Sequence, residues 1–269
     1  MKILKTYNLF GFHMSTPDHF YPLNLKKIPA DYKKNITVLF KNTIDGRVAN
    51  YCRKAGFKEV AELHKGQYYK LGNNFEVTCG YFDEGDSWIC YKAGGVTVLN
   101  TNDCGIRTQA EGGYISNKFP AIDILLTQFS YAYWVGNTAD VAFRQQVADD
   151  KLKWMKFQCD VFKPAVTIPI ASYIYFCHEE NYYMNDSVNT AEKAFNFLQA
   201  NKQTVPVIFY NGDEYHYPEK WDSQKSIRQY KDDFSKIDLN KEVLVKNNSV
   251  PIEEIYSQAK IFIDNLESQ

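Results

Sequence analysis

The chain has 269 residues, which is enough to bury a sizeable core in one large domain or two small ones. It carries 31 lysines and arginines against 32 aspartates and glutamates, a balance that argues against a nucleic-acid or anionic-membrane footprint. The six cysteines form no Cys-x-x-Cys pair, so neither a zinc knuckle nor a disulfide framework is indicated. We expect a cytoplasmic protein, because residues 1–12 lack the apolar core of a secretory leader and no apolar run of about 18 residues occurs.

The first part of the chain alternates predicted strands and helices. Apolar and β-branched residues fill 36–40, which predicts a strand there. Apolar residues at three- and four-residue spacing predict a helix over 45–55, which Gly56 ends. In order, the predicted elements are a strand over 1–12, a helix over 22–30, a strand over 36–40, a helix over 45–55 and a strand over 59–63.

The middle of the chain is predicted to be mainly β structure. Residues 68–99 alternate as paired strands do, and Gly94-Gly95 supplies a hairpin turn. The nearly continuous apolar run 121–129 is typical of a strand that is buried on both faces. A second buried strand is predicted over 165–175, with a break at Pro169.

Helices dominate the predictions for the later part of the chain. A long helix is expected over 138–158, with Asn137 or Thr138 as its cap. Asn189-Thr190-Ala191-Glu192 resembles a capping box and predicts the start of another helix. The remaining predictions are a strand over 205–210, a linker over 236–250 and a final helix from Pro251 with Ile252, Ile255, Ala259, Phe262 and Leu266 on one apolar face.

Two short polar segments stand at the ends of predicted strands. Asp18-His19 follows the first strand, and Asn102-Asp103 ends the strand after the Gly94-Gly95 turn. A strand that ends in an Asp-His pair is a common way to present metal ligands at a sheet edge. The plain alternatives are a solvated turn with a helix cap for Asp18-His19 and an Asx turn for Asp103. The residues by themselves leave these alternatives open.

The order of five segments resembles the metallo-β-lactamase superfamily. The first is similar to its His-x-His-x-Asp-His metal motif, with Met14 and Thr16 in place of the leading histidines. Leu-Asn-x-x-Asp-Cys around Asp103 is similar to the branch that includes the CMP-N-acetylneuraminate hydroxylase hydrolase-like domain and the ascorbate-6-phosphate lactonase group. The five segments are Thr16-Pro17-Asp18-His19, Asp86-Ser87-Trp88, Val98 to Cys104, Asp123-Ile124-Leu125-Leu126 and Pro169 to His178.

The resemblance implies an α/β protein with a metallo-β-lactamase-like αββα sandwich. It assigns residues 1–217 to this domain and residues 218–269 to a helical C-terminal extension packed on it. The usual first hairpins of the superfamily have no counterpart in the sequence. The sandwich is therefore expected to be N-terminally truncated, to be completed by a partner chain that supplies the missing strands, or to have a remodelled N-terminus.

The resemblance also implies that one of two metal sites is kept and the other is lost. Residues that match the ligands of the kept site are Asp18, His19, Asp103 and His178. Residues that replace the histidines of the lost site are Met14, Thr16 and Phe82. The implied cofactor is one divalent transition metal, zinc foremost, with iron and manganese as alternatives.

The function implied by the resemblance is a single-metal hydrolase or lactonase that acts on a small molecule through a metal-bound hydroxide. Asp18 and Glu179 are the candidate catalytic residues, and Glu180 or Asp213 are alternatives to Glu179 for orienting the hydroxide. A solvated helix start is the plain alternative for Glu179 and Glu180. The candidate substrate-binding residues are Trp134, Tyr182 and Tyr183, for which ordinary packing is the alternative.

A different class of function is also open. The chain is then a degenerate, non-catalytic binding or assembly module, or one half of a split enzyme that acts on sugar-derived substrates. A neighbouring short chain that carries the upstream hairpins would favour the split enzyme. Neither version predicts a nucleic-acid or membrane partner.

Overall fold

The computed structural model describes residues 9–12, 20–82, 85–237 and 250–267. Within these ranges the strands form a three-stranded sheet and a seven-stranded sheet. The small sheet is parallel and has the order β1 (Leu9–Phe12), β2 (Thr37–Lys41), β3 (Glu59–Leu63). The large sheet has the order β10 (Val205–Pro206), β9 (Val166–Ile170), β8 (Ile124–Gln128), β7 (Val96–Asn102), β6 (Ser87–Ala93), β5 (Phe75–Tyr81), β4 (Tyr68–Gly72).

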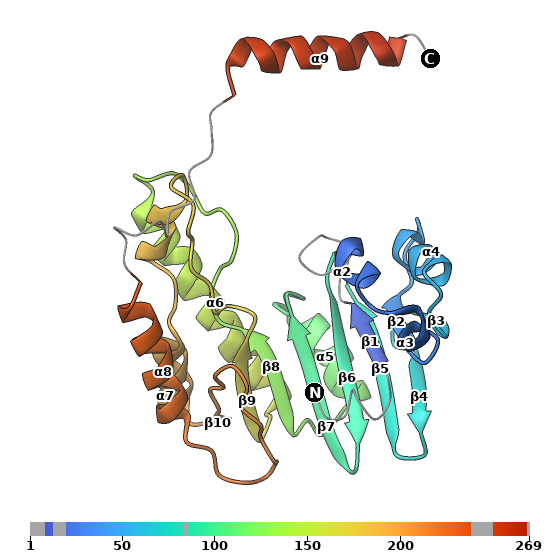
Figure 1. The fold of residues 1–269 in the computed structure, drawn as a ribbon. Coiled ribbons are helices and arrows are strands. Elements are labelled where there is room, and N and C mark those ends of the chain that lie inside the picture. The colour runs from blue at the N-terminus through green and yellow to red at the C-terminus, as the bar shows by residue number, and fades with distance from the viewer. Residues whose placement is uncertain (1–8, 13–19, 83–84, 238–249, 268–269) are drawn as a thin grey trace.

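The two halves of the large sheet differ in strand direction. Strands β4 to β7 run antiparallel to one another, and β7 to β10 run parallel. Parallel neighbours need long crossover connections, and helices supply them here. Consequently the carboxyl ends of β7, β8 and β9 lie along one edge of the sheet (Figure 1).

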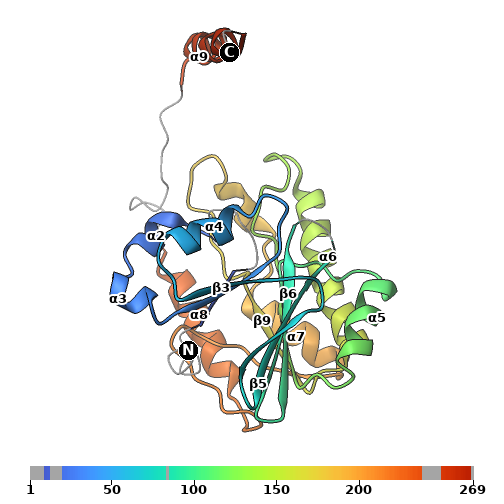
Figure 2. The same ribbon diagram turned by 90° about the vertical axis from the view of Figure 1, so that its right-hand side faces the viewer.

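Figure 2 shows the layers, and the clusters of buried apolar side chains explain them. The two sheets face each other, and Leu39 and Leu63 of the small sheet pack with Val77 and Ile89 of the large one. Helices α4 (Arg47–Lys54) and α2 (Pro22–Lys26) cover the outer face of the small sheet. Val48 and Cys52 of α4 pack on the strands of this sheet. Helix α3 (Ala30–Lys33) lies between α2 and β2 in the chain. The outer face of the large sheet is covered by α5 (Gln109–Lys118), α6 (Val141–Phe162) and α7 (Ala191–Asn201). The order of layers is helix, sheet, sheet, helix, which confirms the predicted α/β sandwich.

Helix α5 is absent from the sequence predictions, although the sequence holds a clear signal for it. The Thr108 hydroxyl accepts a hydrogen bond from the Glu111 backbone N–H at 3.2 Å, and the Glu111 carboxylate accepts one from the Thr108 N–H at 2.9 Å. This reciprocal pair is a capping box, and the spacing Thr-x-x-Glu of Thr108 and Glu111 predicts it from the sequence.

Several predicted boundaries are wrong. The predicted helix over 22–30 divides into α2 and α3, because Pro29 separates them. The strand predicted to run to residue 175 ends at Ile170, because Ala171 has a left-handed backbone with φ of 54°. The strand predicted over 205–210 is ladder-paired only at Val205–Pro206.

The long helix begins three residues later than predicted. Its N-cap is Asp140, and neither Asn137 nor Thr138 caps it. The carbonyl groups of Asn137 and Thr138 accept hydrogen bonds from the Arg144 guanidinium, which holds the preceding turn in a non-helical shape. The helix then continues past residue 158 and ends at Phe162.

The C-terminal helices differ in their contacts. Helix α8 (Ser223–Ser235) packs on the sandwich, because Ile227 is buried with Phe195 and Ile208. Every described side chain of α9 (Ile252–Glu267) from Ile252 to Leu266 is exposed, including its predicted apolar face. Most of the predicted linker lies outside the described residues, and the domain boundary at residue 217 stays a prediction. No helix in the described ranges combines the length and the apolar character needed to cross a membrane.

Candidate functional site

Two of the four predicted metal ligands, Asp18 and His19, lie outside the described residues. The catalytic role predicted for Asp18 therefore stays a prediction. The site is therefore built here from Asp103 and His178 and from the side chains that surround them.

Asp103 follows the last residue of β7, at the edge where the parallel strands end. The Asx turn at this place belongs to Asn100, whose side-chain oxygen accepts a hydrogen bond from the Asn102 N–H at 3.0 Å. Asn102 itself has a left-handed backbone with φ of 41°, which redirects the chain out of the strand. The Asp103 carboxylate accepts hydrogen bonds from side chains on two neighbouring strands.

Gln128 ends the neighbouring strand β8 and reaches Asp103 across the sheet edge. Its amide nitrogen donates a hydrogen bond to one carboxylate oxygen of Asp103, and the Asn102 amide donates to the other at 3.0 Å. The Gln128 amide oxygen in turn accepts a hydrogen bond from the Lys151 ammonium of α6 at 2.7 Å. Because the ammonium can only donate, it fixes which end of the Gln128 amide faces Asp103.

Lys151 is 7% exposed and is the feature of this site that the sequence did not reveal. Burial first, and then the like charge of Arg107, lower the pKa of its ammonium, and Asp103 and Asp86 oppose the shift, so that the pKa is about 8. One lysine within a helical pattern gives no sign that it is buried. Only the packing of α6 over the ends of β7 and β8 places it beside Asp103.

Two spaces open beside Asp103, and they share Asp103, Cys104, Gly105 and Arg107 in their walls. The larger, called the Asp103 hollow, has a volume of about 250 Å³ and is lined by Phe82, Gly85, Asp86, Asp103, Cys104, Gly105, Arg107 and Glu111. The smaller, called the Lys151 recess, has a volume of about 20 Å³ and includes Gln128, Lys151 and Trp154 in its wall. Phe82 therefore presents a ring to the hollow at the position where the resemblance implies a lost histidine ligand.

His178 and Glu179 lie on the segment that follows β9. His178 is half-buried, and its backbone N–H donates to the Asn181 side chain at 3.2 Å. Glu179 and Glu180 are exposed. Asp213, the other candidate for orienting the nucleophile, accepts hydrogen bonds from the Tyr210 N–H at 2.7 Å and the Ser226 hydroxyl at 2.9 Å, which hold a turn against α8.

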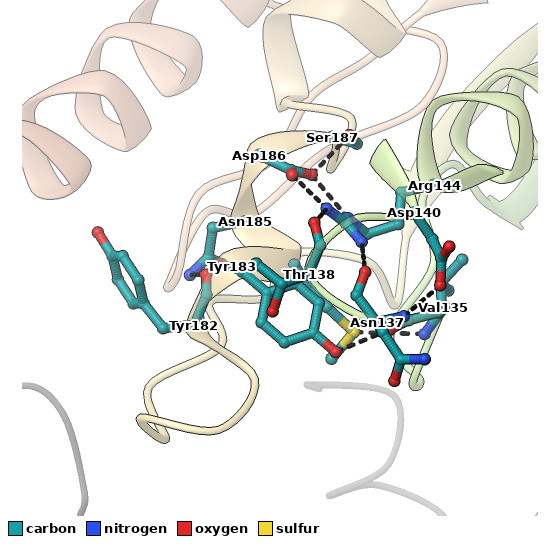
Figure 3. A network of polar contacts seen from close by, with 12 residues as sticks. Val135, Asn137, Thr138, Asp140, Arg144, Tyr182, Tyr183, Asn185, Asp186 and Ser187 are labelled. Atoms are coloured by element: carbon teal, nitrogen blue, oxygen red, sulfur yellow. Dashed lines mark hydrogen bonds and ion pairs between the residues drawn. The ribbon is translucent and has the colours of Figure 1, made fainter. Parts of the chain in front are cut away.

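Tyr182 and Tyr183 lie in the 3-10 helix Tyr182–Asp186 of the loop after β9, and Tyr183 bonds this loop to the loop that carries Trp134 and Gly136 (Figure 3). The Tyr183 hydroxyl donates to the Gly136 carbonyl at 2.7 Å, and its ring centroid lies 4.9 Å from the Arg144 guanidinium carbon. Tyr182 accepts a hydrogen bond from Tyr175 at 3.3 Å. Trp134 is 63% exposed. Tyr183 thus joins the loops together, and a role for any of the three in substrate binding stays a prediction.

Solved structures of known proteins share this arrangement of layers. The chain superposes on Igni18, a metallo hydrolase from Ignicoccus hospitalis, with a TM-score of 0.53 and 11% identity, covering 79% of this chain and 80% of that one. It superposes on CmlA, a diiron β-hydroxylase from Streptomyces venezuelae, with a TM-score of 0.52 and 12% identity over 74% of this chain. Both are proteins of one fold.

The chain has the metallo-β-lactamase fold. It spans 43% of the length of CmlA, so the likeness covers less than half of that protein. No protein-family model matches the sequence, and no curated protein matches it either. The metallo-β-lactamase fold is therefore established by structure, and the branch suggested by Leu-Asn-x-x-Asp-Cys stays a prediction.

The described residues do not by themselves complete a metal site of this fold. Among them, no three His, Cys, Asp or Glu side chains converge closely enough to hold a metal ion. Asp103 and His178 have donor atoms suited to zinc or iron, and the completion of the site by Asp18 and His19 stays a prediction. Phe82 offers no donor atom, which fits one metal ion better than two.

Proposed function

We propose that the chain is a metal-dependent hydrolase of the metallo-β-lactamase fold that holds one divalent metal ion. The proposed ligands are Asp18, His19, Asp103 and His178. The observation that carries the proposal is the Asp103 carboxylate, which lies at the end of β7, lines the Asp103 hollow and is held by the Asn102 and Gln128 side chains. The description of Igni18 as a metallo hydrolase supports it, because that protein is matched over 80% of its length.

The metal would supply Lewis-acid chemistry, lowering the pKa of water and polarising a carbonyl or phosphoryl oxygen. The residues of the chain orient the ligand. Asn102 and Gln128 hold the two oxygens of Asp103, and Lys151 holds Gln128. Hydrogen-bonded partners of this kind fix the direction in which a carboxylate presents its lone pairs.

The reaction class follows from the single ion. With one metal there is no second ion to clamp the attacking and leaving oxygens, so easily cleaved bonds are the better substrates. We propose small lactones, esters and phosphodiesters, in that order. Zinc is the first candidate metal, and Glu179 is the candidate for orienting the nucleophile.

Metal content by elemental analysis tests the proposal. Purified without chelator, the wild-type protein should carry about one equivalent of a transition metal, because the folded chain brings the four ligand residues together to bind it. His19→Ala and His178→Ala should each lose it. His64→Ala is the matched control, since His64 is exposed in the turn after β3 and should keep the metal.

Two results would contradict the proposal. Metal bound as tightly by His178→Ala as by the wild type would show that the ligand assignment is wrong. No metal in the wild type, even after reconstitution, would mean that Asp103 and His178 are remnants and that the fold serves as a binding or assembly module. If the wild type does bind metal, its hydrolysis of lactones, esters and phosphodiesters is measured next.

A further inference from the structure

One aromatic ring beside the site holds two cationic side chains. The Arg107 guanidinium carbon lies 3.9 Å from the centroid of the Trp154 ring, and the Lys151 nitrogen lies 5.4 Å from the same centroid. Trp154 and Arg107 both line the Lys151 recess, and Arg107 also lines the Asp103 hollow. The positively charged groups of Arg107 and Lys151 therefore both lie beside the Trp154 ring, in the wall of the Lys151 recess.

The guanidinium of Arg107 is held in place by its surroundings. It lies across Gly105, where an added Cβ would come within 2.6 Å of its Nε atom and 2.8 Å of an Nη atom. Arg107 is an exposed residue, and its guanidinium lies between the bare backbone of Gly105 and the ring of Trp154. These contacts restrict the conformations of the Arg107 side chain before a ligand binds, which lowers the conformational entropy that the side chain loses on binding.

The Arg107 guanidinium also has unused donors. It forms no hydrogen bond or ion pair with any residue that the structure describes. The adjacent carboxylate, that of Glu111, is engaged by the backbone N–H groups of Arg107 and Thr108, both at 2.9 Å. The fork of N–H groups remains free to bind an oxyanion in two places at once.

Lys151 adds a second positive charge from inside the recess. One of its N–H groups is used by Gln128, and its ammonium is nearly covered from solvent. Removing an ammonium from water is costly unless an opposite charge compensates it. Asp103 and Asp86 compensate part of this charge. In the proposed function the charge of Asp103 is committed to the metal, so an anion in the hollow would add to the compensation.

We propose that Arg107 and Lys151 form an oxyanion subsite beside Asp103 and that the substrate carries a carboxylate or phosphate group which this subsite binds. Arg107 supplies the hydrogen bonds, Trp154 and Gly105 hold it, and Lys151 strengthens the positive field. The role in substrate recognition rests on the proposed function, but anion binding itself is measurable whether or not the metal is present.

Isothermal titration calorimetry with inorganic phosphate and with acetate tests the subsite. Arg107→Gln should weaken binding about tenfold or more, as expected when charge-assisted hydrogen bonds are lost. Gly105→Ala should weaken it as well although Arg107 is unchanged, because the new methyl group displaces the guanidinium. Lys151→Met tests the second charge, and Arg228→Gln, on the exposed surface of α8, should bind as the wild type does.

Circular dichroism on each variant separates loss of binding from loss of folding. The preferred probe assigns the substrate group, a phosphate ester if phosphate binds more tightly and a carboxylate if acetate does. No saturable binding of either anion by the wild type, or equal binding by a folded Arg107→Gln, would overturn the subsite.

The variant His178→Ala distinguishes this inference from the proposed function. Phosphate that still binds His178→Ala but not Arg107→Gln supports the subsite independently of the metal. Phosphate that binds Arg107→Gln but not His178→Ala would show that the anion sits on the metal, which supports the proposed function and overturns the subsite.

Discussion

Replacing Arg144 by methionine tests the network that ties the two aromatic loops together. The Arg144 side chain is 0% exposed and donates two hydrogen bonds to Asp186, at 2.9 and 2.6 Å. It also donates to the carbonyl groups of Asn137 and Thr138 (Figure 3). Methionine fills similar space but donates nothing, so the variant leaves a carboxylate and two carbonyl groups without these partners.

The expected loss of stability follows from how exposed the orphaned groups become. Removing one partner of a buried ion pair costs about 3–5 kcal/mol when the other charge stays buried. The Asp186 side chain is 35% exposed, so water can reach its carboxylate in the variant. We therefore expect the free energy of unfolding to fall by about 3 kcal/mol, at the lower end of that range.

Urea denaturation followed by tryptophan fluorescence measures this change. The transition midpoint should move to lower urea while the slope stays the same, because the surface exposed on unfolding is similar. Arg228→Met is the control, since Arg228 is 68% exposed and lies 3.9 Å from Asp222, and it should change stability by less than about 0.5 kcal/mol. A loss below about 1 kcal/mol for Arg144→Met would refute the view that this network fixes the loops.

The same pair predicts a pH dependence. The hydrogen bonds from the Arg144 guanidinium hold the pKa of the Asp186 carboxyl below its ordinary value. A carboxyl with a lowered pKa in the folded state stabilises the protein above the unfolded pKa, about 3.9, and this contribution is lost as the pH falls through the folded value. The stability difference between the wild type and Asp186→Asn should therefore be full at pH 7 and shrink below about pH 4. A difference that stays constant to pH 3 would contradict this account.

Two further predictions concern packing and thiol chemistry. Gly80→Ala should lower the free energy of unfolding by about 3 kcal/mol or more in urea titrations, because the new Cβ would lie 2.1 Å from the buried Trp88 ring. Gly113→Ala is the control and should be neutral or stabilising, because a Cβ there has nothing within 4 Å. Equal effects of the two changes would contradict the crowding. A thiol reagent should label Cys177 quickly and the other five cysteines slowly, because Cys177 alone is half-buried and burial raises the pKa of others, that of Cys90 to about 12. The fast phase should disappear in Cys177→Ser, and its persistence would show that a buried cysteine is reached.

The sequence predicted local structure well where short-range pattern decides it. The β-branched run of β2 and the apolar run of β8 are buried strands, as expected from residues that favour an extended backbone. Helix α5 was missed because Gly112-Gly113 in its middle disfavours a helix. The reason for Gly112 is tertiary: a Cβ there would lie 2.7 Å from Val161 of α6.

Helix and strand ends were predicted less well for a related reason. The start of α6 depends on Arg144 drawing in two carbonyl groups, with Asp186 of a distant loop completing the network. The end of β9 depends on the left-handed Ala171, a conformation that alanine rarely adopts and that its sequence neighbours do not announce.

The sequence by itself determined most of the strands and helices and the position of Asp103 at a strand end. These follow from apolar periodicity and turn residues, which act over a few positions and can be read along the chain. The αββα sandwich was implied by the resemblance to the superfamily, and only the structure gives the order of the strands in each sheet. Only the tertiary structure decided which side chains surround Asp103. Lys151 and Trp154 line a space with Asp103 because α6 lies over the ends of the parallel strands, and these residues, far from Asp103 in the sequence, come beside it only once the layers have packed. Gly105 leaves room for the Arg107 guanidinium against the Trp154 ring.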